Sequence, residues 1–570
     1  MNVKPIPTLP PFGPGAAAGV QAFGAAVGDM LKSMSGLSVP ADVMSRLQAD
    51  YVEQASALWN DALGRLNDDT TQRPSLTDRR FAAAEWAGNP GAAYLAQMYL
   101  LNARTLMQLA DAIEGDEKTR QRIRFAVQQW IDAAAPSNYL ALNPEAQRRA
   151  LETRGESITQ GLQLLWKDIQ RGHLSQTDES VFEVGRNVAT SEGSVVYQNE
   201  LFQLLDYKPL TAKIYERPLL MVPPCINKFY ILDLQPENSL IRYAVEQGHR
   251  VFVLSWRNPD ESLAAKTWDD YIEQAVLQAI GLVQDISRAE TINTLGFCVG
   301  GTLLATALAV AAARGERPAA SMTLLTTLLD FEDTGVLDLF VDEAGTRLRE
   351  MTIGTEAPGG PRLLQGKELA TTFSFLRPND LVWNYVVGNY LKGETPPPFD
   401  LLYWNSDGTN LPGPMYCWYL RNTYLENQLK QPGRLNVCGQ PVDFAAIQVP
   451  SYVYGSREDH IVPWQGAYRS VPLLGDEVRF TLGASGHIAG VINPPTKRKR
   501  SHWVHPAGDL PQQAEAWLSG ATEQAGSWWP DWAEWLKALS GKQIAAPKSA
   551  GNRRYKAVEP APGSYVKARV

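Results

Sequence analysis

The sequence predicts an α/β protein in which a helical N-terminal domain precedes a mostly parallel, doubly wound sheet. Up to about residue 172, apolar residues recur at the spacing of amphipathic helices. From about residue 182, short apolar runs alternate with helical segments, which is the pattern of parallel strands joined by crossover helices. At 570 residues, the chain is long enough for more than one domain.

The first third of the chain carries the helical pattern. A helix is expected to begin near Pro40, because apolar residues then follow in steps of three and four along one face. Further helices are expected over 92–113, 120–135 and 144–172. We take residues 1–178 as a helical domain. Its apolar faces form its own core, or in part bind a partner or a hydrophobic particle.

The segment before these helices differs in composition. Residues 11–28 are small and uncharged, but Pro11 and Pro14 interrupt them and Lys4 is the one basic residue that precedes them. This disfavours a signal peptide. We therefore expect residues 1–35 to be a disordered, weakly apolar arm.

Six apolar runs are predicted to be buried parallel strands. They occupy residues 217–224, 249–256, 291–297, 320–330, 450–456 and 478–484. From these runs we expect a catalytic α/β domain over residues 179–570. The alternation stops between 331 and 449, where aromatic residues and prolines are frequent. We interpret this insertion as a lid; for its outer half, additional core helices are an equally good interpretation.

The C-terminal part contains one more helix and a tail. A helical pattern places Trp528, Trp532, Trp535 and Leu539 on one face, which predicts packing against the sheet. The residues from Lys542 onward are basic and rich in proline and glycine. We expect them to form a solvated, flexible tail.

The most informative motif is Gly296-Phe297-Cys298-Val299-Gly300, between a predicted strand and a helix that starts at once. This is the sharp turn of an α/β-hydrolase, with cysteine where a lipase carries serine. Glycines are expected on both sides because bulky neighbours would collide with the strained backbone. Cys298 is therefore the candidate nucleophile.

A thiol nucleophile needs a base and a group that orients the base. Asp459 and His487 each follow a predicted strand, in the chain order nucleophile, acid, histidine of this fold. The carboxyl ends of parallel strands lie at one edge, so the three residues should converge there. His460 adjoins Asp459 and is a candidate for contact with the site, or an exposed loop residue.

The oxyanion hole of this fold uses two backbone N–H groups. One should belong to Val299. The other should come from Cys225 or Ile226, because Pro223 and Pro224 have no N–H. A cysteine nucleophile exchanges one thioester for another and keeps the acyl group activated. The chemistry therefore favours acyl transfer from a thioester over hydrolysis, although cysteine hydrolases of this fold also exist.

Composition excludes several other classes. The net charge of −8 argues against a general nucleic-acid binder. The four cysteines form no C-x-x-C pair, which suits a reducing cytoplasm. No cluster of side chains shows metal-ligand spacing, and no apolar run is long enough to span a bilayer.

At these residues the chain resembles the class I polyhydroxyalkanoate synthases, from about residue 75 to the C-terminus. The family's catalytic Cys, Asp and His fall on Cys298, Asp459 and His487, and its motif-region Trp on Trp404. The matching stretches include NKFYILDLQPENSL, GFCVGGTLLATALA, FSFLRPNDLVWNYVV, LPGPMYCWYLRNTYLENQL, YGSREDHIVPW and GASGHIAGVINPP.

The resemblance implies polymerisation of (R)-3-hydroxyacyl-CoA, chiefly 3-hydroxybutyryl-CoA, with release of CoA through an acyl-thioester on Cys298. It implies no cofactor, a homodimer, and a cytoplasmic protein that associates with polyester granules and with granule proteins. Phe399 and Ala489 are expected near the acyl pocket. Two alternatives remain: a thioesterase or carboxylester hydrolase with the same triad, and a granule-bound scaffold with a vestigial triad.

Overall fold

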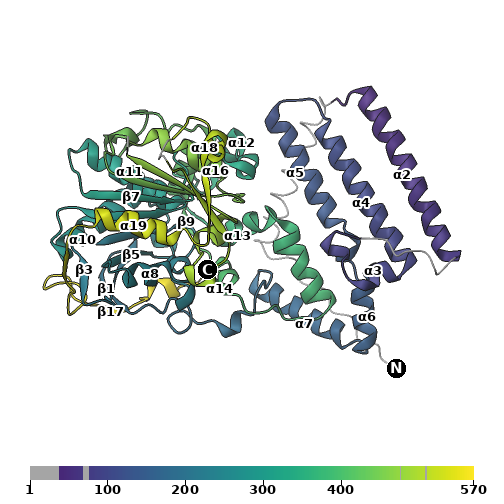
Figure 1. Ribbon diagram of the computed structural model, residues 1–570, viewed down its shortest axis with the longest axis horizontal. Helices are drawn as coiled ribbons and strands as arrows, with labels where there is room; N and C mark the ends of the chain where they lie inside the picture. The colour runs from purple at the N-terminus through teal and green to yellow at the C-terminus, as the bar shows by residue number, and fades with distance from the viewer. Residues whose placement is uncertain (1–37, 68–75, 476, 507–509, 570) are drawn as a thin grey trace. The chain divides into compact units, whose positions relative to one another are not determined.

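The computed structural model describes residues 38–67, 76–475, 477–506 and 510–569 (Figure 1). The chain divides into two compact units. One comprises Met1–Gln176 and Thr372–Pro396, and the other comprises Thr177–Thr371 and Pro397–Val570. Residues 372–396, which the sequence pattern places in the lid, thus belong to the helical unit. The predicted disorder of residues 1–35 lies outside the described residues.

The helical unit contains the predicted amphipathic helices. Its long helices are α2 (Ala41–Asn67), α4 (Pro90–Asp111) and α5 (Glu117–Ala133), which pack in that order. Short helix α3 (Ala84–Gly88) precedes α4. The helix expected over 144–172 is two helices, α6 (Pro144–Glu152) and α7 (Glu156–Arg171). They are separated where Gly155 has φ +87°, a left-handed conformation that ends the first helix.

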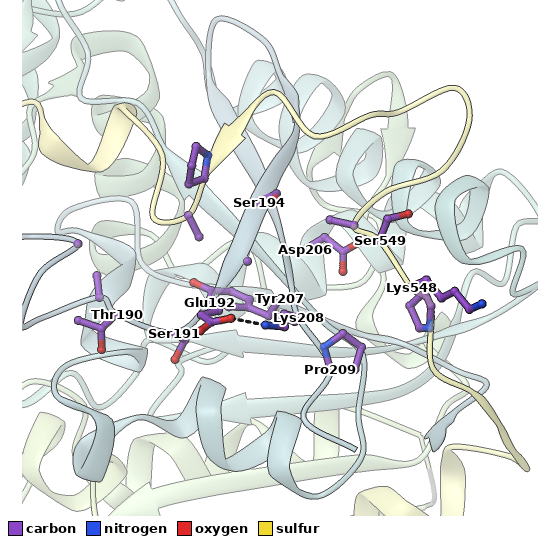
Figure 2. A pocket seen from close by; sticks show the side chains of 17 residues that line it. Thr190, Ser191, Glu192, Ser194, Asp206, Tyr207, Lys208, Pro209, Lys548 and Ser549 are labelled. Carbon is purple, nitrogen blue, oxygen red and sulfur yellow. Dashed lines mark hydrogen bonds and ion pairs between the residues drawn. The ribbon is translucent and has the colours of Figure 1, made fainter. Parts of the chain in front are cut away.

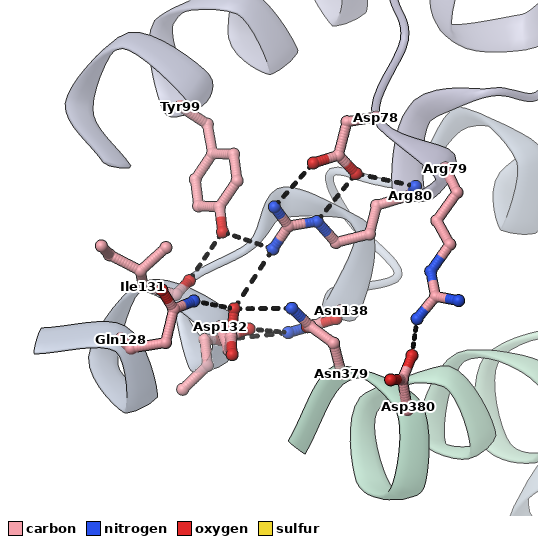
Figure 3. A network of polar contacts seen from close by, with 11 residues as sticks. Asp78, Arg79, Arg80, Tyr99, Gln128, Ile131, Asp132, Asn138, Asn379 and Asp380 are labelled. Atoms are coloured by element: carbon pink, nitrogen blue, oxygen red, sulfur yellow. Dashed lines mark hydrogen bonds and ion pairs between the residues drawn. The ribbon is translucent and has the colours of Figure 1, made fainter. Parts of the chain in front are cut away.

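A buried polar network ties residues from 379 onward to these helices (Figure 3). The Arg80 guanidinium donates to Asp78 Oδ2 at 2.8 Å and to the Tyr99 hydroxyl at 2.8 Å. Asp132 Oδ1 lies 3.5 Å from Arg80 and accepts a 2.6 Å hydrogen bond from Asn379 Nδ2. Burial raises the pKa of Asp132, although these hydrogen bonds and Arg80 act in the opposite direction. The network is therefore one reason why residues 372–396 belong with the helical unit.

The second unit is built on an eleven-stranded sheet with the order β15-β14-β13-β12-β7-β6-β4-β5-β2-β1-β17. Its six central strands run parallel and coincide with the six predicted runs. They are β4 (Leu219–Val222), β5 (Val251–Trp256), β6 (Ile292–Phe297), β7 (Ala319–Leu325), β12 (Ser451–Ser456) and β13 (Val478–Gly483). The predicted mostly parallel sheet is confirmed.

Antiparallel strands complete the sheet at both ends. Strands β1 (Gly193–Gln198) and β2 (Phe202–Tyr207) extend it beyond β5. Strands β14 (Ser501–Val504) and β15 (Thr522–Ala525) extend it beyond β13. These additions leave the carboxyl ends of the parallel strands together at one edge, where the candidate residues were predicted to meet.

Apolar side chains alternate between the two faces of the sheet. In β5, Phe252 and Leu254 join one core and Val251 and Val253 join the other. The first core contains α10 (Gln278–Ser287) and α11 (Val299–Ala313). The second contains α8 (Leu240–Glu246) and α19 (Trp529–Leu539). The two helical layers hold the sheet in the middle of the unit, and the tryptophan-rich helix packs against the sheet as predicted.

The insertion between β7 and β12 consists of short elements, of which the last residues of α13 fall in the helical unit. Its helices are α12 (Glu343–Thr352), α13 (Gly366–Phe375), α14 (Asp400–Asn405) and α15 (Gly413–Tyr419). A π-helical segment, Leu420–Leu425, continues α15. The strand pairs β8 (Leu363–Leu364) with β9 (Leu411–Pro412) and β10 (Asn436–Val437) with β11 (Gln440–Pro441) complete it.

The prediction of a flexible tail from Lys542 is wrong for the described residues. Strand β16 (Gln543–Ala545) pairs with β3 (Lys213–Tyr215), and β17 (Glu559–Pro560) pairs with β1 at the edge of the large sheet. Val566 is 1% exposed. An edge strand offers unpaired N–H and C=O groups, and the tail supplies partners that its basic composition did not reveal.

Candidate active site

The turn between β6 and α11 holds Cys298 in a strained conformation. Its φ is +53° and its ψ is −128°, a region that residues other than glycine rarely adopt. The Cys298 N–H donates to the Leu325 carbonyl at 2.9 Å, and the Thr327 hydroxyl donates to the Cys298 carbonyl at 3.1 Å. These bonds from the neighbouring strand fix the backbone, so that the half-buried thiol stays at the top of the turn.

The glycines around Cys298 are required by close backbone contacts. A Cβ on Gly296 would lie 2.4 Å from the Cα of Gly301. A Cβ on Gly300 would lie 2.3 Å from the carbonyl oxygen of Val222, at the end of β4. The expectation that the turn excludes side chains on both flanks is therefore met. The second contact also shows that the loop after β4 passes directly against the start of α11.

Asp459 and His487 follow β12 and β13 and form a buried pair. Asp459 Oδ2 lies 2.6 Å from His487 Nδ1, and His487 begins the short helix α17 (His487–Val491). Asp459 Oδ1 accepts the N–H groups of Ile461 at 2.8 Å and Val462 at 2.9 Å. The Phe297 ring stacks on the imidazole, with centroids 5.7 Å apart. The carboxylate is thus fixed by two backbone donors and orients the imidazole.

The electrostatics connect this pair to the thiol. Burial lowers the pKa of His487, but the Asp459 carboxylate and the Cys298 sulfur outweigh it and raise this pKa to about 10. The imidazole of His487 is therefore oriented by Asp459, and it is the group that can accept the proton of Cys298.

The predicted oxyanion donors lie on the same side of the sheet. Val299 is the first residue of α11, and the first N–H groups of a helix have no partner within it. Cys225 and Ile226 belong to the loop after β4. Burial, with a smaller electrostatic contribution from Cys298, raises the pKa of the Cys225 thiol to about 12. This raised pKa makes Cys225 a poor nucleophile itself.

The remaining candidates occupy different positions. His460 is half-buried and directly follows Asp459, and Ala489 lies in α17, two residues after His487. Trp404 is buried in α14, and its indole N–H donates to the Lys228 carbonyl at 2.7 Å. Phe399 precedes α14 and is 48% exposed. His460 and Ala489 thus adjoin triad residues along the chain, whereas Trp404 contacts the loop that follows β4.

Two tyrosines of the insertion were missed. Burial raises the pKa of Tyr419 and of Tyr424, and the sulfur of Cys298 contributes to both shifts. The Tyr419 and Tyr424 rings lie 5.7 Å apart, and both contact Phe331 edge-on. We name Phe331, Tyr419 and Tyr424 the aromatic wall. The aromatic richness of the insertion was visible in the sequence, but not which of its rings interact electrostatically with the thiol.

A well-formed cavity of about 470 Å³ lies elsewhere, at the sheet edge formed by β1, β2 and the tail (Figure 2). Its lining includes the ion pair between Glu192 and Lys208, whose atoms are 2.6 Å apart. None of the triad residues lines it. The reactive groups therefore do not belong to this cavity, and we place the candidate site at Cys298.

The described residues contain no group of three or more His, Cys, Asp or Glu side chains placed to hold a metal ion. In the same part of the chain, no helix is long and apolar enough to cross a membrane.

The parallel sheet, the turn at Cys298 and the acid and histidine after β12 and β13 define an α/β-hydrolase-fold protein with a Cys–His–Asp triad. The alpha/beta hydrolase fold model matches residues 218–494, and that of the poly-beta-hydroxybutyrate polymerase (PhaC) N-terminus matches residues 77–244. The chain belongs to the poly(3-hydroxyalkanoate) polymerase family, which confirms the resemblance to polyhydroxyalkanoate synthases.

Two relatives carry this assignment. The poly(3-hydroxyalkanoate) polymerase subunit PhaC of Cupriavidus necator is 62% identical over 539 residues, which cover 95% of this chain and 91% of the relative. The subunit of the same name from Rhizobium meliloti is 39% identical over 561 residues, which cover 96% and 90%. The similarity therefore extends through both units.

Proposed function

We propose that this protein is a class I polyhydroxyalkanoate synthase that polymerises (R)-3-hydroxyacyl-CoA, chiefly 3-hydroxybutyryl-CoA, and releases CoA. Its membership of the polymerase family, together with the buried Asp459–His487 pair beside Cys298, carries the proposal. The reaction uses side chains and backbone N–H groups alone, so no cofactor or metal is required.

In the acylation step, His487 takes the proton of Cys298 and the thiolate attacks the carbonyl carbon of the acyl-CoA. The N–H of Val299, with that of Cys225 or Ile226, stabilises the oxyanion that forms. The C–S bond to CoA then breaks, and the leaving thiolate takes the proton from His487. The acyl group is left as a thioester on Cys298.

In the transfer step, the 3-hydroxyl of a second acyl unit, or of the chain end, attacks the thioester. His487 accepts the hydroxyl proton, an ester bond forms, and the C–S bond to Cys298 breaks with return of the proton to sulfur. Asp459 holds the imidazole in the orientation that both steps need.

Water competes with the hydroxyl in the transfer step, because attack by water releases a free acid. The aromatic wall supports exclusion of water, since its partly buried tyrosine rings pack on Phe331 and interact electrostatically with Cys298. A thioesterase with the same triad would lack this requirement. Ala489, close to His487 in α17, is the candidate for contact with the acyl chain.

We infer further that the protein acts as a homodimer in the cytoplasm and associates with the granules of its product, without a nucleic-acid partner. The net charge of −8 is unsuited to binding nucleic acid. Helix α7 supports the contact with an apolar surface. Its residues Leu162, Trp166 and Ile169 are 61%, 57% and 61% exposed, and they lie along one side of the helix.

The test is incubation of the purified protein with (R)-3-hydroxybutyryl-CoA, with CoA thiol release and the acyl product followed together. The proposal requires CoA release with insoluble polyester, and the loss of both in Cys298→Ala. Cys438→Ala is the matched control, because Cys438 is also half-buried but bonds to the Asp269 carbonyl, away from the triad. Release of CoA with free 3-hydroxybutyrate alone would identify a thioesterase, and full activity of Cys298→Ala would refute the mechanism.

A further inference from the structure

The loop after β4 supplies the second oxyanion donor, and it contains no regular structure from Pro223 to Lys228. We name these residues the oxyanion loop. Beyond its first residues, three backbone contacts join this loop to one neighbouring segment, residues 404–409, at the end of α14. The Thr409 N–H donates to the Ile226 carbonyl at 3.0 Å, and Asn227 forms an antiparallel bridge with Gly408. The Trp404 indole donates to the Lys228 carbonyl at 2.7 Å.

The segment that holds the loop is itself fixed around Asp407. This residue is 3% exposed, and its Oδ2 accepts a 2.8 Å hydrogen bond from the Tyr230 hydroxyl. Its N–H donates to the Trp404 carbonyl at 3.0 Å. Oδ1 receives no hydrogen bond among the described residues, and its ion-pair partner is Arg569, 4.0 Å away. A buried carboxylate with so few donors depends on nearby positive charge.

The positive charge comes partly from the oxyanion loop itself. Lys228 is 3% exposed, and its Nζ donates to the Ala568 carbonyl at 2.5 Å. Burial lowers the pKa of Lys228, and Asp407 opposes this shift. Arg569 stacks on the Tyr403 ring at 4.6 Å and adds a second cation. Ala568 and Arg569 of the tail therefore contact Lys228 of the oxyanion loop and Asp407 of residues 404–409.

We propose that Asp407 is a positioning residue for the reaction: paired with Arg569 and bonded to Tyr230, it fixes residues 404–409, which hold the oxyanion loop where its N–H groups meet the developing oxyanion. The inference rests on the proposed function, because it assigns a role in that reaction. An oxyanion donor acts only within about 2.7–3.1 Å of the oxygen, so a small displacement of the loop weakens it. Asp407 and Lys228 are placed to affect catalysis through the loop, without touching substrate.

The first measurement compares Asp407→Asn with wild type by steady-state kinetics and by the first turnover of CoA release from (R)-3-hydroxybutyryl-CoA. Asparagine keeps the shape and accepts the Tyr230 hydrogen bond, but removes the charge. We expect kcat and the first-turnover rate to fall about 10–100-fold, with KM changed less than about 2-fold. Equal kcat in the two proteins, or a rise in KM alone, would overturn the inference.

A double substitution separates positioning from general damage. Asp407→Asn alone leaves the buried Lys228 ammonium without the negative charge that interacts with it, whereas Lys228→Met combined with Asp407→Asn removes both charges. We expect the double variant to recover at least about 3-fold of the lost kcat, because replacing both of these buried charges leaves no uncompensated lysine in the loop. A double variant no better than the worse single one would contradict the pairing.

Asp206→Asn is the matched control. Asp206 is also a buried carboxylate in an ion pair, 2.6 Å from Arg250, but it lies in β2 at the far side of β5. This variant should lower the melting temperature without lowering kcat of the folded protein. If Asp407→Asn does not fold, Tyr230→Phe, which removes one donor to Asp407, should lower kcat with KM retained. Wild-type protein without CoA release would refute the proposed function, whereas active wild type with normal variants would refute the positioning role alone.

Discussion

The two carboxylate oxygens of Asp459 have different hydrogen-bond partners. Oδ1 accepts two backbone N–H groups, and Oδ2 faces His487 Nδ1 at 2.6 Å. The side chain of Asp459 is 0% exposed, so bulk solvent does not reach these bonds. A carboxylate fixed in this way determines which imidazole nitrogen carries the proton, and it leaves the other nitrogen for the thiol.

Asp459→Asn should keep the backbone hydrogen bonds but present an N–H₂ group or a neutral oxygen to the imidazole. Because the histidine then loses its preferred tautomer, kcat should fall by about 10²–10⁴. Steady-state CoA release measures the change. Asp443→Asn is the control, since Asp443 caps a short helix and its Oδ1 accepts the Ala445 N–H. A retained kcat in Asp459→Asn would contradict the role of the carboxylate.

The titration of His487 should make the free energy of unfolding depend on pH. Burial lowers its pKa, but Asp459 and Cys298 raise it to about 10, above the value of about 6.5 expected for an unfolded chain. The folded state therefore holds this proton more tightly. Its contribution to the free energy of unfolding is complete below pH ~6.5 and is lost as the pH rises through the folded pKa.

Urea unfolding of wild type and of His487→Gln across this pH window measures how the free energy of unfolding of each protein changes with pH. Relative to the variant, wild type should lose stability as the pH rises. A wild-type protein that gains stability over the variant across this window would contradict the ion pair.

At the scale of elements, the turn between β6 and α11 depends on the approach of the loop after β4. Gly300 has backbone neighbours that cannot move aside, because a Cβ there would lie 2.3 Å from the Val222 oxygen and 2.5 Å from the Pro223 oxygen. The oxyanion loop and the nucleophile are thus held together by a contact that any side chain at this position would break.

Gly300→Ala should therefore separate the oxyanion loop from α11. We expect the free energy of unfolding to fall by about 1–3 kcal/mol and kcat to fall at least about tenfold. Gly281→Ala is the matched control, because Gly281 lies in α10 with nothing within 4 Å of an added Cβ. It should stabilise the helix by about 0.5–1 kcal/mol with unchanged kcat. Equal behaviour of the two variants in denaturation and kinetics would contradict this account.

At the scale of the whole molecule, the chain passes between the two units three times, after residues 176, 371 and 396. Within the helical unit, residues 372–396 make buried polar contacts. Asn389 Nδ2 donates to the Ser175 carbonyl at 2.8 Å, and the Tyr390 hydroxyl donates to Asp168 at 2.7 Å. Part of the insertion is thus stabilised by the helical unit, although in sequence it lies between two segments of the catalytic unit.

Asn379→Ala should loosen this segment, because it removes a 2.6 Å hydrogen bond to the buried Asp132. We expect a loss of about 1–3 kcal/mol and faster hydrogen exchange over residues 372–396. Arg377→Ala is the control: Arg377 pairs with Asp380 but is 51% exposed, so its loss should cost less than about 1 kcal/mol. Equal exchange in wild type and Asn379→Ala would show that the network does not hold the segment.

Local pattern was sufficient for the fold class, the six parallel strands and the positions of Cys298, Asp459 and His487. Each parallel strand is predicted by a short apolar run. The nucleophile is predicted by a glycine-flanked turn, because the steric requirements of that turn involve only neighbouring residues. Chain order then assigned the acid and the histidine, because the carboxyl ends of parallel strands share one edge.

Tertiary structure decided the rest. It packed Tyr419 and Tyr424 together with Phe331, and it placed residues 372–396 in the helical unit and the tail against the sheet. It also built the cluster of Asp407, Lys228 and Arg569, in which Tyr230 bonds to a residue 177 positions away and Lys228 to one 340 positions away. Such pairings depend on burial and charge compensation between distant segments, and no local periodicity encodes them.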